Sequence, residues 1–491
     1  MDASHRGRYS DFDARAGGGG GGSKSSLTIE PSGSDGHRGF AAESRGSGGS
    51  GGKRSLTGSL SIYSLDVDLL CTIFSLLDHF DLVRCSVVCK AWYHVVYTSS
   101  LMRDLYEKRN SCIKLTAKSL PLEISTKFYL GELAMEEHKL SFRRASAKVD
   151  QWNGHHTRVN ICRMKRGVVL SGVGDKVLSS SEVMSLHGFI LLFDHVLRLW
   201  SAKSCKYMDE YIIPETDKLV DYEFDENKIV GLTNSKLCIW RRHGQRGIFQ
   251  SHEGVFTRGL CMSYIDPEAV IGCEDGRVRV FDMYSGKCSR IFRVHSGPVT
   301  CLALTDDQLI IGGSTFGNIA VVDLTSGERL GFARSNYCPT GLKTLSYNTN
   351  SHLLFAGSTS GYAHCWDIRT MRSVWETRVS PNVIYSVHHL SIDTSTLAVG
   401  GLDGVLRILD QRTGEILSSL VMDDAAISIK SAHDNQKVSE KKARSLPQNA
   451  CLYNVPRSLR PPITCLSVGM KKIVTTHNEK FIRIWRFQDN I

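Results

Sequence analysis

The sequence predicts a mainly β chain, in which a seven-bladed β-propeller follows a small all-α module and a disordered N-terminal tail. Three observations predict this fold: an octet that returns about every 40 residues after residue 150, three short stretches with helical apolar spacing, and a Gly/Ser-rich stretch before them. A chain of 491 residues with 41% hydrophobic and 22% charged residues has the composition of a globular protein with several structural units.

Residues 1–59 are predicted to form the disordered tail. They are rich in Gly, Ser and Arg, as in AGGGGGGS at 16–23 and RGSGGSGGKR at 45–54. Such a segment cannot bury enough apolar surface to offset its chain entropy. It lacks the apolar core of a secretory signal, and no stretch of the chain reaches the roughly 18 to 20 apolar residues that span a bilayer. We therefore expect an intracellular protein, cytoplasmic or nuclear, without a membrane anchor.

The 15 cysteines are scattered along the chain without a CxxC pair, and most lie inside apolar runs. This pattern favours buried, reduced thiols over disulfides or zinc ligands. The formal net charge of +10 would suit an acidic or phosphorylated partner, or nucleic acid.

Residues 60–106 are predicted to form the helical module. The apolar residues of its first helix recur at helical spacing: Leu69, Leu70, Ile73, Phe74, Leu76 and Leu77. Asp81 is the expected N-cap of a second helix, and a third contains Trp92, Val95 and Val96. Three short helices enclose little core, so the module is expected to be stabilised by contacts with a partner or with the adjacent chain. The charged residues 107–146 are expected to form a helical linker.

The stretch SLDVDLLCTIFSLLDHFDLVRCSVVCKAWYHVV at 64–96 resembles an F-box. The resemblance is carried chiefly by Leu82, Arg84, Cys85, Val88, Cys89, Lys90 and Trp92. One departure is that Asp66 follows Leu65, where the family usually has proline. The resemblance implies docking through an apolar helical face onto the Skp-type adaptor of a cullin ubiquitin ligase. The residues expected to dock, some of which must instead form the module's own core, are Leu69, Leu70, Ile73, Leu82, Cys85, Val88 and Trp92.

One octet returns beyond residue 150, most plainly as DGRVRVFD at 275–282 and DGVLRILD at 403–410. Asp-Gly favours a tight turn, and the alternating apolar residues after it favour a strand. The seventh residues of the copies are spaced by 41, 41, 44, 43 and 76 residues, and they are Trp240, Phe281, Val322, Trp366, Leu409 and Trp485. A period near 40 with about four short strands per unit is typical of a β-propeller.

Residues 147–491 resemble the WD-repeat family. Besides the period, the resemblance is carried by SHEG at 251–254 and HSGP at 295–298 before first strands, and by the closing pair Trp366-Asp367. In that family a histidine before a first strand joins a structural hydrogen-bond network with a turn Asp, a Ser or Thr and the Trp. The residues that fit this network are His155, Ser171, Asp175 and Trp200, with His252 and Asp275 in part.

An insert interrupts the first blade. Removing residues 177–195, which contain the apolar run GFILLF, joins Lys176 to Val196 and yields DKVLRLWS, in register with DGRVRVFD. We hypothesise that these 19 residues are a splice or gene-model variant. The alternative is an apolar recognition loop. Transcripts that consistently include these codons would contradict the first hypothesis.

Two further features concern the end of the chain. The last blade needs an outer strand from elsewhere, and the segment SAKVDQW at 146–152 can supply it, leaving no open sheet edge. A second insert, near 422–462, is polar and charged, and we expect a mobile loop. Because strands alternate in direction, both inserts are expected on one face of the propeller.

No arrangement of residues indicates catalysis. Phosphate-loop, HExxH, GxSxG and kinase motifs are missing from the sequence, so we expect no enzyme activity, no cofactor and no metal. The two resemblances together imply a substrate receptor of a cullin ubiquitin ligase, whose propeller face holds an acidic or phosphorylated protein. Arg158 and Arg258, which are expected to start first strands near this face, are candidates for substrate contact. Two alternatives stay open: a WD-repeat scaffold without ligase association, and nucleic-acid binding through the basic segments.

Overall fold

The computed structural model describes residues 65–110, 125–173, 196–213, 218–233, 236–243, 248–250, 258–335, 340–423, 428–431, 437–447 and 450–487. The chain divides into two units, Met1–Leu65 and Asp66–Ile491, and the elements below belong to the second. The predicted tail at 1–59 and the insert at 177–195 lie outside the described residues.

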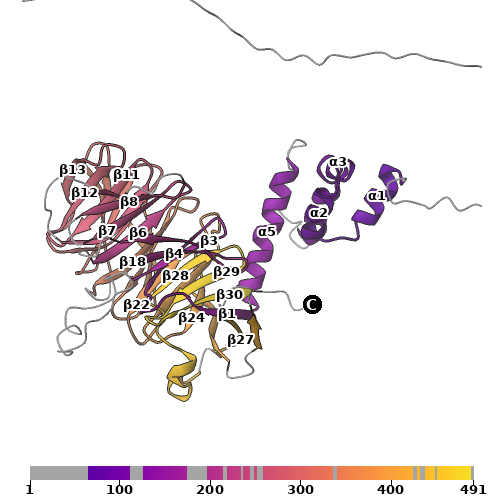
Figure 1. The fold of residues 1–491 in the computed structure, drawn as a ribbon. Helices are drawn as coiled ribbons and strands as arrows, with labels where there is room; N and C mark the ends of the chain where they lie inside the picture. The colour runs from indigo at the N-terminus through magenta and orange to yellow at the C-terminus, as the bar shows by residue number, and fades with distance from the viewer. Residues whose placement is uncertain are drawn as a thin grey trace, which may run out of the picture. The chain divides into compact units, whose positions relative to one another are not determined.

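The helices of the described residues all precede the sheets (Figure 1). They are α1 (Val67–Phe74), α2 (His79–Ser86), α3 (Lys90–Thr98), α4 (Leu101–Asn110) and α5 (Thr126–Arg143). Apolar side chains of the first three helices form a small core, which contains Leu70, Phe74, Leu82, Val95 and Val96. The ring of Trp92 meets that of Phe74 edge to face, with centroids 5.2 Å apart.

The caps of α1 and α2 are both aspartates. Asp66 caps α1, because its Oδ1 accepts a hydrogen bond of 2.9 Å from the Leu69 N–H. The departure from proline at this position therefore leaves the start of the helix intact. The expected cap of α2 at Asp81 was wrong by one turn. Asp78 is the cap and accepts from the Asp81 N–H at 2.7 Å, since it has extended backbone while Asp81 is already helical.

The sheets are antiparallel, and five of them have four strands each. The first two contain β2 (Ile161–Lys165), β3 (Val168–Gly172), β4 (Val196–Ser201) and β5 (Tyr207–Ile212), then β6 (Leu219–Phe224), β7 (Lys228–Thr233), β8 (Leu237–Arg241) and β9 (Ile248–Gln250). The next two contain β10 (Gly259–Ile265), β11 (Glu268–Cys273), β12 (Arg277–Asp282) and β13 (Cys288–Arg293), then β14 (Val299–Leu304), β15 (Leu309–Ser314), β16 (Asn318–Asp323) and β17 (Arg329–Arg334). The fifth contains β18 (Leu342–Asn348), β19 (Leu353–Ser358), β20 (Tyr362–Asp367) and β21 (Arg372–Arg378).

A ten-stranded sheet joins the two ends of the β region. It contains β22 (Ile384–His388), β23 (Thr396–Gly401), β24 (Leu406–Asp410), β25 (Ile416–Met422), β26 (Ser428–Ser431), β27 (Lys437–Ser445), β1 (Ala147–Asn153), β28 (Cys465–Gly469), β29 (Lys472–Thr476) and β30 (Phe481–Phe487). Two 3₁₀ turns, η4 (Leu452–Asn454) and η5 (Arg457–Leu459), lie between β27 and β28.

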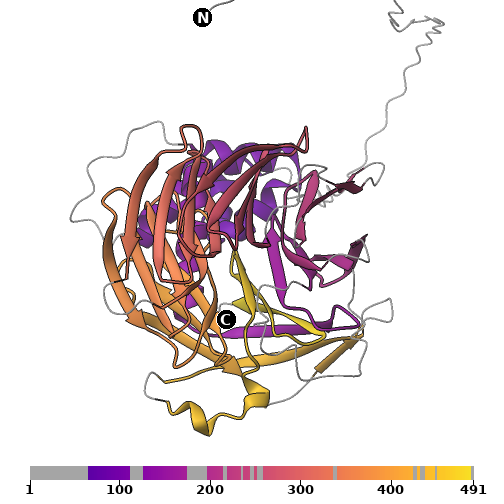
Figure 2. The ribbon, with the colours of Figure 1, turned by 90° about the vertical axis from the view of Figure 1, so that its left-hand side faces the viewer.

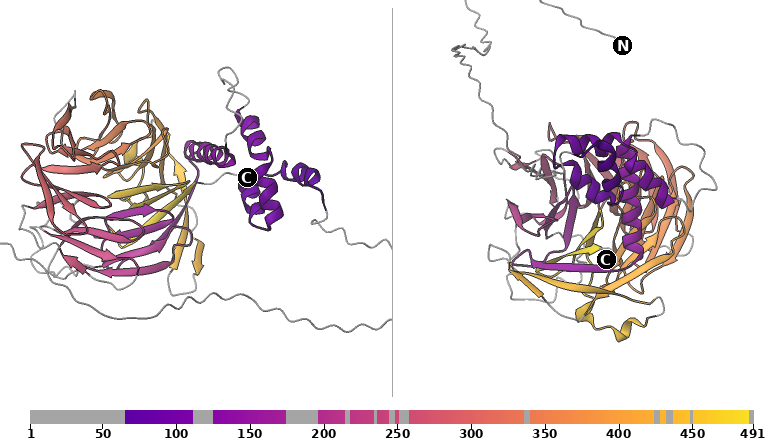
Figure 3. Two further views of the ribbon diagram at one scale, coloured as in Figure 1. Left: turned by 90° about the horizontal axis from the view of Figure 1, so that it is seen from above. Right: turned by 90° about the vertical axis from the view of Figure 1, so that its right-hand side faces the viewer.

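The sheets follow one another around a common axis (Figures 2 and 3). The first strand of each sheet contacts the first strand of the next along β2, β6, β10, β14, β18, β22 and β28, and β28 contacts β2 in turn. The predicted closing strand is confirmed, because β1 pairs along its whole length with β30. The structure is thus a mainly β, propeller-like fold preceded by short helices.

The second insert is not the loop that its polar sequence predicts. Its residues 437–445 form β27, which pairs with β1 between Val438 and Lys442 and with β25 from Ala443 onward. The outer strands of two neighbouring sheets offer unpaired backbone groups, so pairing with them outweighs the low strand propensity of KVSEKKARS.

The strand after the first insert has the predicted register. Val169 of β3 pairs with Trp200 of β4, as Ala269 pairs with Phe281 in the octet at 275–282. The strand begins at Val196, the first residue after the segment 177–195. The origin of the insert itself stays a hypothesis.

Candidate functional site

The helices α1–α3 and their connections expose large apolar side chains. These are Val67, Leu69, Ile73, Leu76, Val87, Val88 and Tyr93, with exposed fractions between 41% and 85%. Seven large exposed apolar side chains within 27 residues are unusual on a surface that binds nothing. We call these seven residues the apolar helical face.

The structure separates the seven residues expected to dock. Leu70 and Leu82 are buried and belong to the module's core. Leu69, Ile73 and Val88 are exposed, whereas Cys85 and Trp92 are half-buried. The exposed residues that sequence reasoning left out of the docking set are Val67, Leu76, Val87 and Tyr93. Their spacing alone could not tell a core position from a surface position.

The C-terminal half of helix α5 packs against the β region (Figure 1). Phe142 is 1% exposed, and its ring lies 4.4 Å from that of Phe487 in β30. The Lys471 N–H donates to His138 Nδ1 at 3.1 Å. Glu137 binds Lys471 Nζ at 3.5 Å on one side and Arg109 of α4 at 3.3 Å on the other.

A buried polar pair also connects α5 to the β region. His138 Nε2 lies 3.7 Å from Asp393 Oδ2, and both side chains are fully buried. Burial lowers the pKa of His138 to about 4 and outweighs the attraction of the Asp393 carboxylate, which raises it. The imidazole is therefore neutral at pH 7, and it accepts from Lys471 while its second nitrogen faces Asp393.

The contacts of α5 lie at one end of the sheet strands. His138 contacts Asp393 and Lys471, in the turns that follow the first strands β22 and β28. The connections that lead into the first strands, the end of β3, the start of β4 and the end of β25 all lie at the other end of the strands. We call this end of the strands the insert face, and it is remote from the α5 contacts.

The described part of the insert face has more exposed cations than exposed anions. Arg158 and Arg258 are both exposed and precede β2 and β10, whereas the sequence predicted that they start these strands. The other exposed cations of these connections are Lys218, Lys236, Arg277, Arg457 and Lys480, whereas the exposed anions are Glu274 and Glu479. The surface potential of this face thus favours an acidic group.

A cavity of about 230 Å³ lies between the first strands. All the strands β2, β6, β10, β14, β18, β22 and β28 contribute to its lining. The charged side chains that line it are Arg163, Lys165, Glu223 and Lys343. Burial lowers the pKa of His388, which also lines the cavity, to about 3, so this imidazole is neutral.

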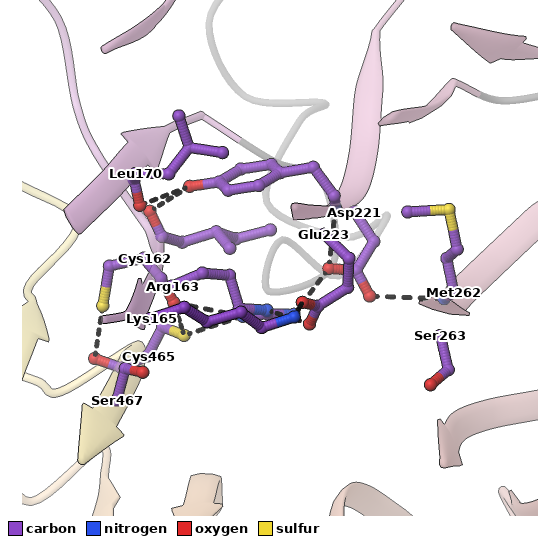
Figure 4. A network of polar contacts seen from close by, with 12 residues as sticks. Cys162, Arg163, Lys165, Leu170, Asp221, Glu223, Met262, Ser263, Cys465 and Ser467 are labelled. Atoms are coloured by element: carbon purple, nitrogen blue, oxygen red, sulfur yellow. Dashed lines mark hydrogen bonds and ion pairs between the residues drawn. The ribbon is translucent and has the colours of Figure 1, made fainter. Parts of the chain in front are cut away.

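Arg163 forms the centre of a buried ionic network beside this cavity (Figure 4). Its Nη2 donates to Asp221 Oδ1 at 2.8 Å and its Nε donates to Glu223 Oε1 at 2.6 Å. Lys165 Nζ lies 2.9 Å from Glu223 Oε2. Burial alone would raise the pKa of Glu223, but Lys165 and Arg163 outweigh it and hold this pKa at about 2. The network joins the first sheet to the second.

Neighbouring first strands are joined by a repeated hydrogen bond, in which a backbone N–H of one strand donates to a polar side chain of the preceding sheet in the ring. Asp221 Oδ2 accepts from the Met262 N–H at 3.3 Å. The other pairs are Leu304 to Ser263, Val387 to Thr344, Leu466 to Ser386 and Met164 to Ser467, at 2.9 to 3.3 Å. These bonds satisfy buried backbone donors and set the register between sheets.

The predicted histidine network is present in the first sheet. Ser171 Oγ accepts from Trp200 Nε1 at 2.8 Å and lies 2.9 Å from His155 Nε2. Asp175 and His252 lie outside the described residues, whereas His295 Nε2 meets the Gly312 carbonyl oxygen at 2.9 Å.

A second network of this kind was missed by the sequence reasoning. Thr475 Oγ1 accepts from Trp485 Nε1 at 2.9 Å and lies 2.8 Å from His477 Nε2. His477 follows the second strand of its sheet, whereas the prediction searched before first strands.

Comparison with known proteins adds the family. Residues 64–108 match the F-box-like family model. The chain is 43% identical over 454 residues to an F-box/WD-40 repeat-containing protein of Arabidopsis thaliana, across 87% of this chain and 95% of that protein. The chain belongs to the F-box/WD-40 repeat family.

More distant relatives of this F-box/WD-40 repeat protein match shorter parts of the chain. The human angio-associated migratory cell protein is 25% identical over 167 residues, which are 30% of this chain and 38% of the relative. The bovine target of rapamycin complex subunit LST8 is 21% identical over 192 residues, which are 39% of this chain and 58% of the relative. The chain thus spans well under two thirds of either. Among the described helices, none is long and apolar enough to cross a membrane.

Proposed function

We propose that this F-box/WD-40 repeat protein is the substrate-receptor subunit of a Skp–cullin–F-box ubiquitin ligase. In this proposal the apolar helical face docks on the Skp-type adaptor, which connects the chain to a cullin. The observation that carries the proposal is the exposure of Leu69, Ile73 and Val88 on a module that matches the F-box family. Burying each of these side chains against a partner would contribute about 1.5–3 kcal/mol.

The substrate is proposed to be an acidic or phosphorylated protein, held by the insert face. The excess of exposed cations on this face supports the proposal, and Arg158 and Arg258 are its candidate contacts. The chain itself is proposed to be non-catalytic. It would act by raising the local concentration of substrate lysines near a ubiquitin-charged enzyme.

A helical linker at 107–146 and a seven-bladed propeller at 147–491 are proposed to position the substrate. The closed series of first-strand contacts supports seven blades, if the ten-stranded sheet is counted as two blades joined through β27. The contacts of His138 and Phe142 support a linker that holds the propeller in one orientation. We propose an intracellular location, where such ligases act.

The proposal is tested by co-purifying the full chain with a Skp-type adaptor. Leu69→Asp with Val88→Asp places two charges on the apolar helical face without touching the core residues Leu70 and Leu82. Desolvated contacts of this kind cost 2 kcal/mol or more each when lost, so we expect binding to weaken at least about 30-fold. Arg103→Asp, at an exposed polar position of α4, is the control and is expected to bind normally.

Circular dichroism of the variants verifies that the helices remain folded. Equal adaptor binding by the double variant and the wild type would refute docking through this face. A folded wild-type chain that does not bind would favour the alternative of a WD-repeat scaffold. Loss of all association at moderate salt would instead favour an electrostatic partner such as nucleic acid.

A further inference from the structure

Two cysteines face each other where the first and last sheets of the ring meet. Cys162 lies in β2 and Cys465 lies at the start of β28, 303 residues later. The Sγ of Cys465 lies 3.3 Å from the Cys162 carbonyl oxygen, and the Sγ of Cys162 lies 3.8 Å from the Cys465 carbonyl oxygen. Each thiol therefore points at the strand of the other (Figure 4).

The surroundings of the two thiols differ. Arg163 Nη1 donates to Cys465 Sγ at 3.4 Å, so a guanidinium contacts this sulfur. Cys162 is fully buried, and burial, together with a hydrogen bond to the Cys465 side chain, raises the pKa of the Cys162 thiol well above its ordinary value. Cys162 thus stays a thiol, whereas a cation contacts the sulfur of Cys465.

The two thiols also differ in access. Cys465 lines the cavity of about 230 Å³ between the first strands and is 8% exposed, whereas Cys162 is 0% exposed. A molecule of the size of hydrogen peroxide fits such a cavity and would reach Cys465 first.

We propose that Cys465 and Cys162 are a redox-active pair that hydrogen peroxide converts to a disulfide joining the first and last sheets. The sulfur of Cys465 attacks one peroxide oxygen and the O–O bond breaks, and the leaving hydroxide takes the Cys465 thiol proton as water, which gives a sulfenic acid at Cys465. The Sγ of Cys162 then attacks the sulfenic sulfur. The S–S bond forms, the S–O bond breaks, and the leaving hydroxide takes the Cys162 thiol proton as water. In total, two thiols and one peroxide give a disulfide and two waters.

The proposal modifies the expectation that the cysteines are buried thiols that stay reduced. Sequence spacing could not indicate it, because the two residues come from opposite ends of the β region and meet only through ring closure. The proposal does not rest on ligase association. A disulfide here would close a loop of about 300 residues. It would covalently link the first and last sheets, which are otherwise held together by the pairing of β1 with β30 and by other non-covalent contacts.

The test uses the full chain, titrated with hydrogen peroxide, followed by blocking of free thiols, non-reducing digestion and mass spectrometry. We expect a linked pair of peptides containing Cys162 and Cys465, which disappears with dithiothreitol or in Cys465→Ser. Cys301→Ser is the matched control, because Cys301 is also buried and lines the same cavity, and it is expected to keep the link.

A second variant separates the two chemical steps. In Cys162→Ser the sulfenic acid cannot be resolved, so a cyclic diketone probe is expected to label Cys465. The unfolding midpoint in denaturant is expected to rise on oxidation of the wild type and to stay unchanged in Cys162→Ser. Absence of the link at peroxide concentrations that oxidise the exposed Cys451 would overturn the proposal. Diketone labelling of Cys162 in Cys465→Ser, without labelling of Cys465 in Cys162→Ser, would also overturn it.

Discussion

Replacing Arg163 with leucine is expected to lower the free energy of unfolding by about 3–5 kcal/mol. The substitution removes the cation from between Asp221, which is 0% exposed, and Glu223, whose side chain is 18% exposed. Two carboxylates would then lie in a buried site, where Lys165 is the remaining cation that binds one of them. The desolvation cost of the two charges would no longer be compensated. The loss is measured from the unfolding midpoint and slope in denaturant.

A control and a rescue make this result specific. Arg334→Leu, at an exposed position of β17, is expected to change stability by less than about 0.5 kcal/mol. Adding Asp221→Asn and Glu223→Gln to Arg163→Leu is expected to recover part of the loss, because the added amides remove the unpaired charges. Equal stability of Arg163→Leu and the wild type would show that the network contributes nothing to the joint between the first two sheets.

The same network predicts a dependence on pH. The folded pKa of Glu223, about 2, is below the ordinary value of 4.5, so its contribution to stability is present above about pH 4.5. The contribution is lost as the pH falls from there towards 2, because the unfolded chain binds the proton first. In Arg163→Leu the pKa of Glu223 is expected to rise, so acid unfolding should begin at a higher pH than in the wild type.

Replacing Phe142 with alanine is expected to cost about 3–5 kcal/mol, because a fully buried aromatic ring is lost and leaves a cavity. The ring packs on Phe487 in the core cluster that also contains Leu420 and Trp485. It is the main apolar contact between α5 and the β region, so its loss should free the helix as well as weaken the core.

Two measurements together detect these effects. Denaturant unfolding gives the stability, and limited proteolysis under native conditions reports whether α5 becomes cleavable. Phe128→Ala, on the same helix but 44% exposed, is the control and is expected to change neither by much. A stability loss without new cleavage in α5 would mean that the contacts of His138 and Glu137, and not that of Phe142, hold α5 against the β region.

The fold could be predicted from the sequence largely because its repeats are local. The octet returns at nearly constant spacing, so Phe281 and Trp200 occupy equivalent positions once residues 177–195 are set aside. Ring closure by β1 could also be predicted, since the last repeat lacked an outer strand. The strand β27 could not be predicted, because its pairing depends on two edges brought together by the ring and not on its own residues.

The candidate sites were less predictable than the fold. Helical spacing identified the apolar residues of α1–α3, but which of them are exposed depends on packing between three helices, so Leu70 and Leu69 could not be separated. The Arg163 network and the Cys162–Cys465 pair join residues from different sheets, and no spacing in the sequence marks them. The Ser171 network was predictable because its residues come from one repeat.

The most direct test of the proposed function is amide hydrogen exchange of the full chain with and without a Skp-type adaptor. If α1–α3 dock through the apolar helical face, exchange should slow in Val67–Phe74 and Lys90–Thr98 when the adaptor is added, and should be unchanged in the sheet strands. Slower exchange in the sheets alone, or no change in these helices at saturating adaptor, would contradict the account.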